Sequence, residues 1–334
     1  MLTGHKAGNG GYSQACAYGL PRFRSTQQAD FAESAYGYRP GRSAQTAVER
    51  VQTALRSGYT DVVDADLTKY FDSIPHDQLM KSVARRISDA KMLRLIKAWL
   101  KAPVEETDQH GGRRLTGGKG SRRGTPQGGV ISPLLANIYM NRLLRVFLER
   151  GKDREFAARL VAYADDFVIL SRGRAQASLA WVRRTLAAIG LSLNETKTCI
   201  RDARREHFDF LGYTFGPAYG KGGRKYLAAK PSKKAVLRVK KNIRKLLWRG
   251  NPAPWQEIRC RLNQMLRGWG NYFRYGRYER AYWTVDQYVY QRTRAFLRRR
   301  HKLPTRGTRQ FNWTTIHSRL GIVSLRQPSV AAQS

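Results

Sequence analysis

The feature that most constrains this chain is a pair of adjacent carboxylates, Asp165 and Asp166, placed between two apolar stretches. Residues 159–162 precede the turn and residues 167–170 follow it, and both stretches are mostly aliphatic or aromatic. Two such stretches separated by a short polar segment predict two antiparallel strands joined by a tight turn. Both carboxylates would then be exposed at that turn.

A second strand-like stretch, residues 62–67, carries another carboxylate, Asp66, near its end. Aspartate is common at turns because it tolerates their geometry and bonds its own backbone, so the Asp165–Asp166 pair alone is also explained by turn chemistry. Carboxylates on two separate strands can bridge a pair of Mg²⁺ ions, as nucleotidyl transfer requires. The pattern therefore indicates a divalent-metal site that handles nucleotides.

The charge of the chain supports a polyanionic partner. Its 334 residues contain 62 Lys and Arg against 24 Asp and Glu, a formal net charge of +38. This excess is larger than solubility requires, and nucleic acid is the usual partner of such a chain. The alternatives are a merely basic protein and a membrane-surface protein, and the second is disfavoured because no basic amphipathic helix stands alone.

The apolar and cysteine patterns exclude several other classes. No run of about 18 apolar residues predicts a transmembrane helix, and the N-terminus lacks the apolar core of a signal peptide. Cys16, Cys199 and Cys260 are far apart, and the six histidines are scattered. Neither a zinc ribbon nor a disulfide framework is supported, so we expect an oxygen-ligated metal such as Mg²⁺ and a reducing cytoplasm.

The order of the expected elements predicts an α+β fold. Residues 1–29 are weakly patterned and are expected to be irregular. The elements that follow are a helix over 43–57 with Ser43 as N-cap, a strand over 60–67, one or two helices over 76–100, a Gly- and Arg-rich loop or hairpin over 105–124, a helix over 133–150 starting at Pro133, the acidic hairpin over 159–171 and a helix over 174–189. This order is typical of an antiparallel sheet with helices on one face.

Residues 231–310 differ in composition from the rest of the chain. They contain 22 Lys or Arg, three acidic residues and twelve aromatic residues. Helical spacing recurs over 232–248, 255–268 and 281–300, which predicts a basic helical domain with a boundary near residues 228–232. Some of the aromatic rings must form its core. The remaining rings, interleaved with cations, would suit a surface that binds phosphates and stacks bases.

Seven blocks, in this order along the chain, resemble the reverse transcriptases encoded by bacterial group II introns. They are YGYRPGRSAQTA at 36–47, VVDADLTKYFDSIPHDQLM at 62–80, RGTPQGGVISPLLANIYMNRL at 123–143, RLVAYADDFVIL at 159–170, GLSLNETKT at 190–198, FDFLGYTFG at 208–216 and GWGNYFRYGR at 268–277. The resemblance implies a polymerase palm with partial fingers, an α-helical thumb and a maturase domain called domain X. The implied divisions are 1–29 irregular, 30–228 fingers and palm, 229–310 thumb and domain X, and 311–334 a C-terminal tail.

The resemblance also implies roles for individual residues. Asp66, Asp165 and Asp166 would be the catalytic triad that binds two Mg²⁺ ions, with the carbonyl of Leu67 as a backbone ligand. Phe71 would be a steric gate against a ribose 2′-OH, although core packing is the alternative. The other residues placed near the dNTP or the template are Lys69, Tyr70, Gln127, Gly128, Gly129 and Lys197. For Lys197 the alternative is a solvated surface lysine.

Further residues are implied to contact nucleic acid. Leu211, Gly212 and Tyr213 would form the primer grip. The residues implied to bind RNA are Arg39, Arg42, Trp269, Tyr272 and Arg277. The implied partners are group II intron RNA, an RNA template, a DNA primer or target, and dNTPs. The implied activity is RNA-directed DNA polymerisation, with domain X binding intron RNA for splicing and mobility.

The chain departs from the family pattern at both ends. Family members carry a longer segment before the block at 36–47, so the chain is expected to be truncated at its N-terminus. No His-Asn-His or zinc endonuclease motif follows residue 310. The alternative function is an inactive remnant or a splicing maturase that binds RNA without polymerising. A third, RNA-templated RNA polymerase, is disfavoured by the bulky Phe71.

Overall fold

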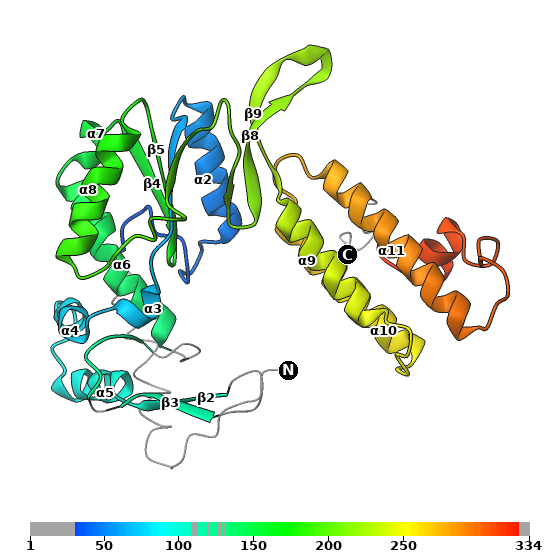
Figure 1. The fold of residues 1–334 in the computed structure, drawn as a ribbon, viewed down its shortest axis with the longest axis horizontal. Helices are drawn as coiled ribbons and strands as arrows, with labels where there is room; N and C mark the ends of the chain where they lie inside the picture. Colours follow the sequence, from blue (N-terminus) through cyan, green and yellow to red (C-terminus); the bar gives the residue numbers. More distant parts are fainter. Residues whose placement is uncertain (1–30, 108–112, 119, 126–128, 130, 327–334) are drawn as a thin grey trace. The chain divides into compact units, whose positions relative to one another are not determined.

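The structure is a computed structural model that describes residues 31–107, 113–118, 120–125, 129 and 131–326 (Figure 1). The chain forms two compact units, which divide between Asp202 and Ala203. The boundary predicted from the sequence lay near residue 228. The structure therefore places the strands between residues 208 and 231 in the second unit, and the assignment of palm and thumb to these units stays a prediction.

A four-stranded antiparallel sheet organises the first unit. Its strands are β1 (Asp61–Ala65), β4 (Ala158–Tyr163), β5 (Asp166–Ser171) and β6 (Cys199–Asp202), in the spatial order β4-β5-β1-β6. The predicted acidic hairpin is β4 and β5, in which Tyr163 pairs with Asp166. Ala65 at the end of β1 pairs with Phe167 of β5. This register brings the residue after β1, Asp66, to the same end of the sheet as the β4–β5 turn.

The longer helices of this unit lie at the positions expected from the sequence, whereas the short helices over 70–73 and 152–155 were not predicted. The described helices are α2 (Ala44–Arg56), α3 (Tyr70–Ser73), α4 (His76–Ala84), α5 (Ala90–Leu100), α6 (Ser132–Glu149), α7 (Lys152–Glu155) and α8 (Ala175–Ala188). The predicted N-cap of α2 is confirmed, because the Ser43 hydroxyl accepts a hydrogen bond from the Thr46 N–H and the Thr46 hydroxyl accepts one from the Ser43 N–H. Strands β2 (Pro103–Thr107) and β3 (Arg113–Gly117) form a separate hairpin.

Both faces of the sheet are covered. Val63 of β1 and Ile169 of β5 lie in one apolar cluster with residues of α6 and α8. On the opposite face Val62 and Leu170 are also fully buried, and α2 contacts β4 and β5. Figure 1 shows α2 and α8 on opposite sides of these strands. The prediction of helices on one face was therefore incomplete, because α2 covers the other face as well.

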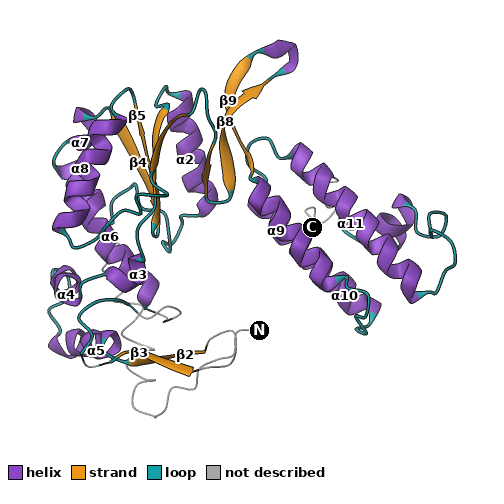
Figure 2. Ribbon diagram, viewed as in Figure 1, coloured by secondary structure: helices purple, strands orange, loops and turns teal. Residues whose placement is uncertain are grey.

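The second unit combines a three-stranded sheet with three helices (Figure 2). Its sheet contains β7 (Phe208–Phe210), β8 (Tyr213–Tyr219) and β9 (Lys225–Pro231), in that spatial order, with the 3₁₀ turn η1 (Lys221–Gly223) between β8 and β9. The predicted helices are confirmed as α9 (Lys233–Leu246), α10 (Trp255–Tyr272) and α11 (Glu279–Arg300). A short π-helical turn, η2 (Thr315–Arg319), follows them. Residues 311–326 were expected to be a tail, but Ile316 and Ile322 are buried in the helical core.

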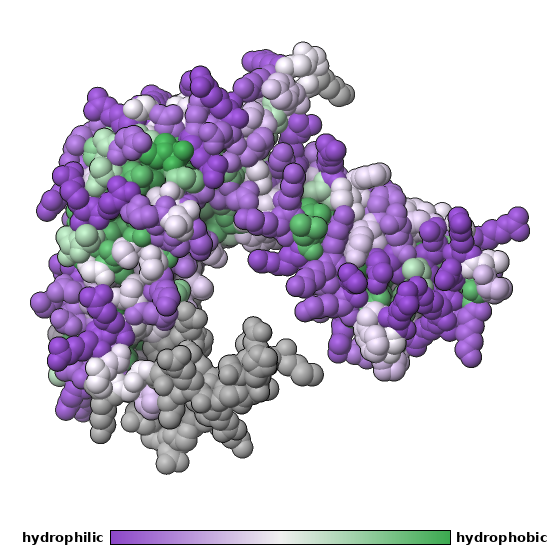
Figure 3. Space-filling model, viewed as in Figure 1, coloured by the Kyte–Doolittle hydropathy of each residue, from purple (hydrophilic) through white to green (hydrophobic). Residues whose placement is uncertain are grey.

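The surface visible in Figure 3 is mostly hydrophilic on both units. Among the described residues, no helix combines the length and the apolar character needed to cross a membrane.

Candidate active site

The β4–β5 turn is held in place by the chain segment that precedes α2. The Tyr36 N–H donates to the Ala162 carbonyl at 2.8 Å, and the Ala162 N–H donates to the Ser34 carbonyl at 2.9 Å. Gly37 lies directly against the turn, and the Asn137 amide donates to the Gly37 carbonyl. Two segments far apart in the sequence therefore fix the backbone that presents the Asp165 and Asp166 carboxylates.

Close packing at Gly37 makes a side chain there costly. A Cβ atom at this position would lie 2.5 Å from the backbone nitrogen of Ala164. We expect Gly37→Ala to lower the free energy of unfolding by about 1–3 kcal/mol, because the turn backbone must move. Chemical denaturation measures the effect. Gly120→Ala is the matched control, since a Cβ there meets nothing within 4 Å, and equal stability of the two variants would contradict the prediction.

Asp66 is held from the other side by residues 192–198. Its carbonyl accepts the Asn194 N–H at 2.8 Å, and the Thr68 N–H donates to the Ser192 carbonyl at 3.0 Å. Neither bond uses the Leu67 carbonyl, the predicted backbone ligand. The ammonium of Lys197 lies 3.2 Å from the Asp66 carboxylate. The sequence placed Lys197 near a triphosphate, and the structure places it beside a predicted metal ligand.

The carboxylates at this end of the sheet repel one another. Partial desolvation, followed by repulsion from Asp165, Asp66 and Asp64, raises the pKa of Asp166 to about 6. The Asp166 side chain nevertheless remains exposed. Asp64 was not singled out from the sequence, although it lies in β1 two residues before Asp66, and side-chain alternation along an extended backbone would direct both carboxylates to the same face. An exposed, mutually repelling carboxylate group favours the binding of a cation.

The donor set at this site fits Mg²⁺ in its chemistry. Asp66, Asp165 and Asp166 supply carboxylate oxygens, the ligands that Mg²⁺ prefers. Their repulsion, which after desolvation contributes to the raised pKa of Asp166, is what a divalent cation relieves. Within the described ranges, no group of three or more His, Cys, Asp and Glu side chains stands in a metal-binding arrangement. The three aspartates are thus candidate ligands on chemistry and electrostatics rather than on a preformed cage.

Two aromatic residues beside Asp66 have different environments. Tyr70 is 3% exposed, and its hydroxyl donates to the Ala136 carbonyl at 2.6 Å. Burial raises its pKa well above the usual value. Tyr70 therefore occupies a core position, and its predicted place beside a nucleotide stays a prediction. Phe71 is only partly buried, and its ring lies edge-on to Tyr70 with centroids 5.7 Å apart. Lys69 adopts the left-handed conformation at the start of α3.

The segment that leads into the predicted template-binding block docks on the same region. The Thr125 N–H donates to the Phe71 carbonyl at 2.7 Å, and the Gly124 N–H donates to the Ile74 carbonyl at 2.9 Å. His76 contacts the Gly124 carbonyl through Nε2 at 2.6 Å. Gln127 and Gly128 lie outside the described residues, so their predicted roles stay predictions. Thr125, two residues before Gln127 in the sequence, is hydrogen-bonded to the backbone of Phe71.

Tyr38 is a residue of this region that the sequence analysis did not single out. It is 47% exposed, and its ring centroid lies 6.4 Å from that of Tyr163. Desolvation, followed by Tyr163 and Asp165, raises its pKa. The sequence shows that Tyr38 belongs to the block at 36–47. It does not show that Tyr38 lies near Asp165, because this depends on a contact between segments more than a hundred residues apart.

Arg39 and Arg42, predicted to hold template phosphates, have partners within the protein. The Arg39 guanidinium donates to the carbonyls of Ala32 at 2.7 Å and Ala35 at 2.9 Å. The Arg42 guanidinium donates to the Glu33 carbonyl. Both arginines therefore stabilise the segment that holds the β4–β5 turn, and their contact with RNA stays a prediction.

In the second unit, the predicted primer grip is a tight hairpin turn. Leu211 and Gly212 both have positive φ, at 50° and 77°, and join β7 to β8 with Phe210 opposite Tyr213. Two positive φ values suit the right-handed twist of the strands. The Tyr213 hydroxyl donates to the Tyr272 carbonyl at 2.6 Å, and the Tyr272 hydroxyl donates to the Leu211 carbonyl at 2.9 Å. Tyr272, predicted to bind RNA, thus holds the turn in place.

The other two residues of this block that were predicted to bind RNA also contact other parts of the protein. The Trp269 ring packs against Tyr282 with centroids 5.7 Å apart. Its Nε1 is buried without a hydrogen-bond partner in the part of the chain that the structure describes. The exposed Arg277 side chain donates to the Tyr219 carbonyl at 3.0 Å, and its N–H donates to the Ala229 carbonyl at 2.8 Å. Trp269 thus packs α10 against α11, and Arg277 joins the loop between these helices to the β8–β9 hairpin. RNA binding by them stays a prediction.

The antiparallel sheet with carboxylates at neighbouring strand ends is the arrangement expected of a polymerase palm. The family model for reverse transcriptase (RNA-dependent DNA polymerase) matches residues 18–215, and that for the group II intron maturase-specific domain matches residues 236–313. The chain belongs to the reverse transcriptases of group II introns, in which a maturase domain follows the polymerase domain. The predicted family and fold class are thereby confirmed.

Individual relatives agree with this assignment. Protein YkfC of Escherichia coli is 32% identical over 222 residues, which cover 56% of each chain. The group II intron-encoded protein LtrA of Lactococcus lactis is 36% identical over 132 residues, 39% of this chain and 20% of LtrA. The chain therefore spans only part of the length of these relatives. A solved telomerase of Candida albicans superposes with a TM-score of 0.49 at 12% identity, over 85% of this chain and 53% of that one, a likeness too weak to support a conclusion.

Proposed function

We propose that this chain is an RNA-directed DNA polymerase of a group II intron. It would add dNTPs to the 3′-OH of a DNA primer on an RNA template, with two Mg²⁺ ions. Its maturase domain would bind intron RNA for splicing and mobility. The observation that carries the proposal is the convergence of Asp66, Asp165 and Asp166, where desolvation and then repulsion from the neighbouring carboxylates raise the pKa of Asp166 to about 6.

The roles of the residues follow from this geometry. Bound Mg²⁺ would neutralise the charge that develops on the attacking and leaving oxygens. Asp66, Asp165 and Asp166 would hold the ions, and Lys197, at 3.2 Å from Asp66, would offer its exposed ammonium to the anionic triphosphate. Lys197 is also a candidate proton donor to the pyrophosphate leaving group. Phe71 would restrict the space beside the nucleotide sugar.

The test is primer extension by the purified full chain on an RNA template with a DNA primer and dNTPs. Extension that requires Mg²⁺ and stops on chelation supports the proposal. No extension over a range of Mg²⁺ concentrations and templates would contradict it, provided that the protein is folded by circular dichroism. RNA affinity measured on the same sample separates loss of chemistry from loss of binding.

The pH profile of extension should report Asp166. Its raised pKa keeps this carboxyl half protonated near pH 6, and it ionises as the pH rises. We therefore expect the extension rate at subsaturating Mg²⁺ to increase with pH through about 6. Because a cation favours the ionised form, more Mg²⁺ should shift the midpoint to lower pH. Rates at several Mg²⁺ concentrations test this, and a midpoint independent of Mg²⁺ would show that another group titrates.

Discrimination between dNTPs and NTPs tests Phe71. Phe71→Ala removes the ring that would meet a ribose 2′-OH, so the preference for dNTPs should fall by about 10- to 100-fold. Single-nucleotide extension with each substrate measures the ratio of kcat/KM values. Phe71→Tyr is the control that keeps the bulk. An unchanged ratio in Phe71→Ala would mean that the ring only packs in the protein. Phe71 would then no longer argue against RNA-templated RNA polymerisation.

A second candidate function is RNA binding without polymerisation, as a splicing maturase or remnant. The observation that favours it is the exposed, basic surface of the second unit, where Trp248 is 53% and Trp283 is 51% exposed. Such rings can stack bases between cations. This function predicts RNA affinity that falls steeply with salt in the absence of any extension. A shallow salt dependence would count against it.

A further inference from the structure

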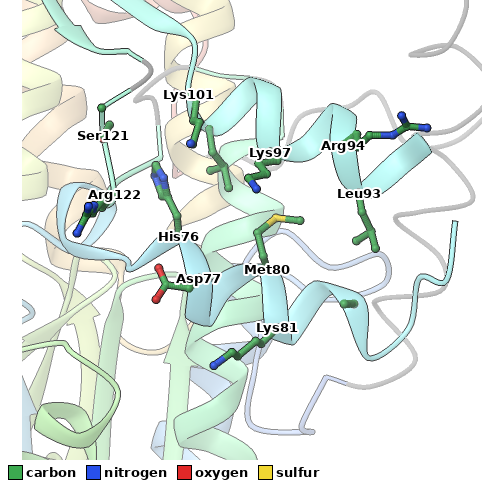
Figure 4. A pocket seen from close by; sticks show the side chains of 13 residues that line it. His76, Asp77, Met80, Lys81, Leu93, Arg94, Lys97, Lys101, Ser121 and Arg122 are labelled. Carbon is green, nitrogen blue, oxygen red and sulfur yellow. The ribbon is translucent and has the colours of Figure 1, made fainter. Parts of the chain in front are cut away.

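We infer that the cavity between α4 and α5 binds one unpaired nucleotide of a single-stranded RNA segment. The cavity has a volume of about 880 Å³ and is lined by α4, α5 and residues 120–122 (Figure 4). This is within the range of cavities that hold small ligands. The inference does not depend on polymerisation, because the lining includes neither the three aspartates nor Lys197.

The wall of the cavity is apolar and suited to a flat base. Met80 of α4 and Leu93 and Leu100 of α5 line it. The spacing of His76, Met80 and Ala84 on α4 repeats every four residues, so these side chains share one face of the helix. Thioether and aliphatic groups make favourable contacts with aromatic rings. A nucleobase could therefore lie between the two helices.

Cations stand beside this apolar wall. Lys97 and Lys101 are one turn apart on α5, and in Figure 4 both side chains reach toward α4, whereas Arg94 points away. Lys81, Arg94 and Arg122 also belong to the lining, and Asp77 is the acidic residue among the described lining residues. Neither lysine forms an ion pair with any residue that the structure describes. Two adjacent unpaired ammonium groups favour a phosphate.

His76 supplies a polar atom with an unmet hydrogen bond. It is 7% exposed, and its Nε2 lies 2.6 Å from the Gly124 carbonyl. A carbonyl only accepts, so Nε2 carries a proton and Nδ1 of the neutral ring is an acceptor. Nδ1 is buried without a partner within the described part of the chain. A buried acceptor of this kind is costly unless a ligand donates to it.

One nucleotide of RNA matches these features. Its base would pack on Met80 and Leu93, and its phosphate would pair with Lys97 and Lys101. Because His76 Nδ1 is closed to solvent in this structure, a 2′-OH or a base amino group would reach it only after the side chains around it move. An acidic peptide would match the lysines but offers no flat donor-bearing ring. A strand is favoured over a free nucleotide, because Arg122 and the exposed Lys81 continue the positive charge at the edge of the cavity.

The test uses the full chain and a fluorescent single-stranded RNA hexamer that carries 4-thiouridine. Irradiation should crosslink the RNA to peptides of α4 and α5, as located by mass spectrometry. The double variant Lys97→Ala/Lys101→Ala should lose that crosslink, and the slope of log affinity against log salt should fall by about 0.7 in magnitude, the value for one phosphate of a single strand. Met80→Trp fills the cavity without changing charge and should also reduce the crosslink at least tenfold.

The matched control is Lys91→Ala/Arg150→Ala, which removes two exposed charges that line none of the described cavities. It should keep the α4–α5 crosslink. Thermal melting of each variant establishes that the fold is retained. Crosslinks only at other sites, or an α4–α5 crosslink unaffected by both pocket variants, would overturn the inference. Equal competition by a free mononucleotide or by an acidic peptide would also overturn it, in favour of those ligands.

Discussion

Replacing Asp165 by Asn is expected to reduce primer extension by roughly 10³-fold or more, with little change in RNA affinity. Asp165 lies in the β4–β5 turn, beside Asp166 and close enough to contribute to the raised pKa of that residue. The amide keeps the size of the side chain but removes the charge that would hold a cation. Extension rates and RNA binding by fluorescence anisotropy, measured on the same preparations, separate chemistry from binding.

The stability of this variant makes the test specific. Removing one of several carboxylates reduces the electrostatic repulsion in the folded state. The Asp165→Asn variant should therefore melt at the same temperature as the parent chain or slightly higher. A loss of extension cannot then be ascribed to unfolding. Asp153→Asn is the control, because it makes the same chemical change at a residue outside the turn. The Asp153 carboxylate pairs with the Arg159 guanidinium at a distance of 3.8 Å. Undiminished extension by Asp165→Asn would refute the assignment of the triad.

The elements of the first unit were predictable because each has a strong local pattern. The continuous apolar stretches on either side of Asp165 define β4 and β5, and Ser43 defines the start of α2 through its hydroxyl. The convergence of Asp66 with Asp165 was predictable only through the resemblance to a family. Nothing local in either strand determines that β1 pairs with β5.

The predicted role of a side chain differs from its observed environment where contacts between distant parts of the sequence decide that environment. Tyr70 and Phe71 are adjacent aromatic residues, but only the tertiary fold places Tyr70 against the Ala136 carbonyl and leaves Phe71 partly open. Arg39 is a basic residue in the block at 36–47 and was predicted to contact RNA. In the structure its guanidinium donates hydrogen bonds to backbone carbonyls of the preceding segment. A basic residue in a motif is thus no proof of a free cation.

The largest effect on stability is expected at Asp286, a buried carboxylate in α11. It is fully buried and accepts hydrogen bonds from the Ser324 hydroxyl at 2.8 Å and the Leu325 N–H at 2.9 Å. The Arg326 N–H donates to the same carboxylate at 3.3 Å. This anchor explains why residues 311–326 are not the tail expected from sequence, since their burial depends on an acceptor supplied about forty residues earlier.

Asp286→Ala should lower the free energy of unfolding by about 3 kcal/mol, because several donors lose a charged acceptor in a site closed to water. Denaturant unfolding measures the loss, and limited trypsin digestion should show faster cleavage at Arg319 and Arg326. Glu279→Ala is the control on the same helix, since Glu279 is exposed and should cost only a few tenths of a kcal/mol. If both variants are equally stable and equally resistant to trypsin, the segment is held by the burial of Ile316 and Ile322 and not by the carboxylate.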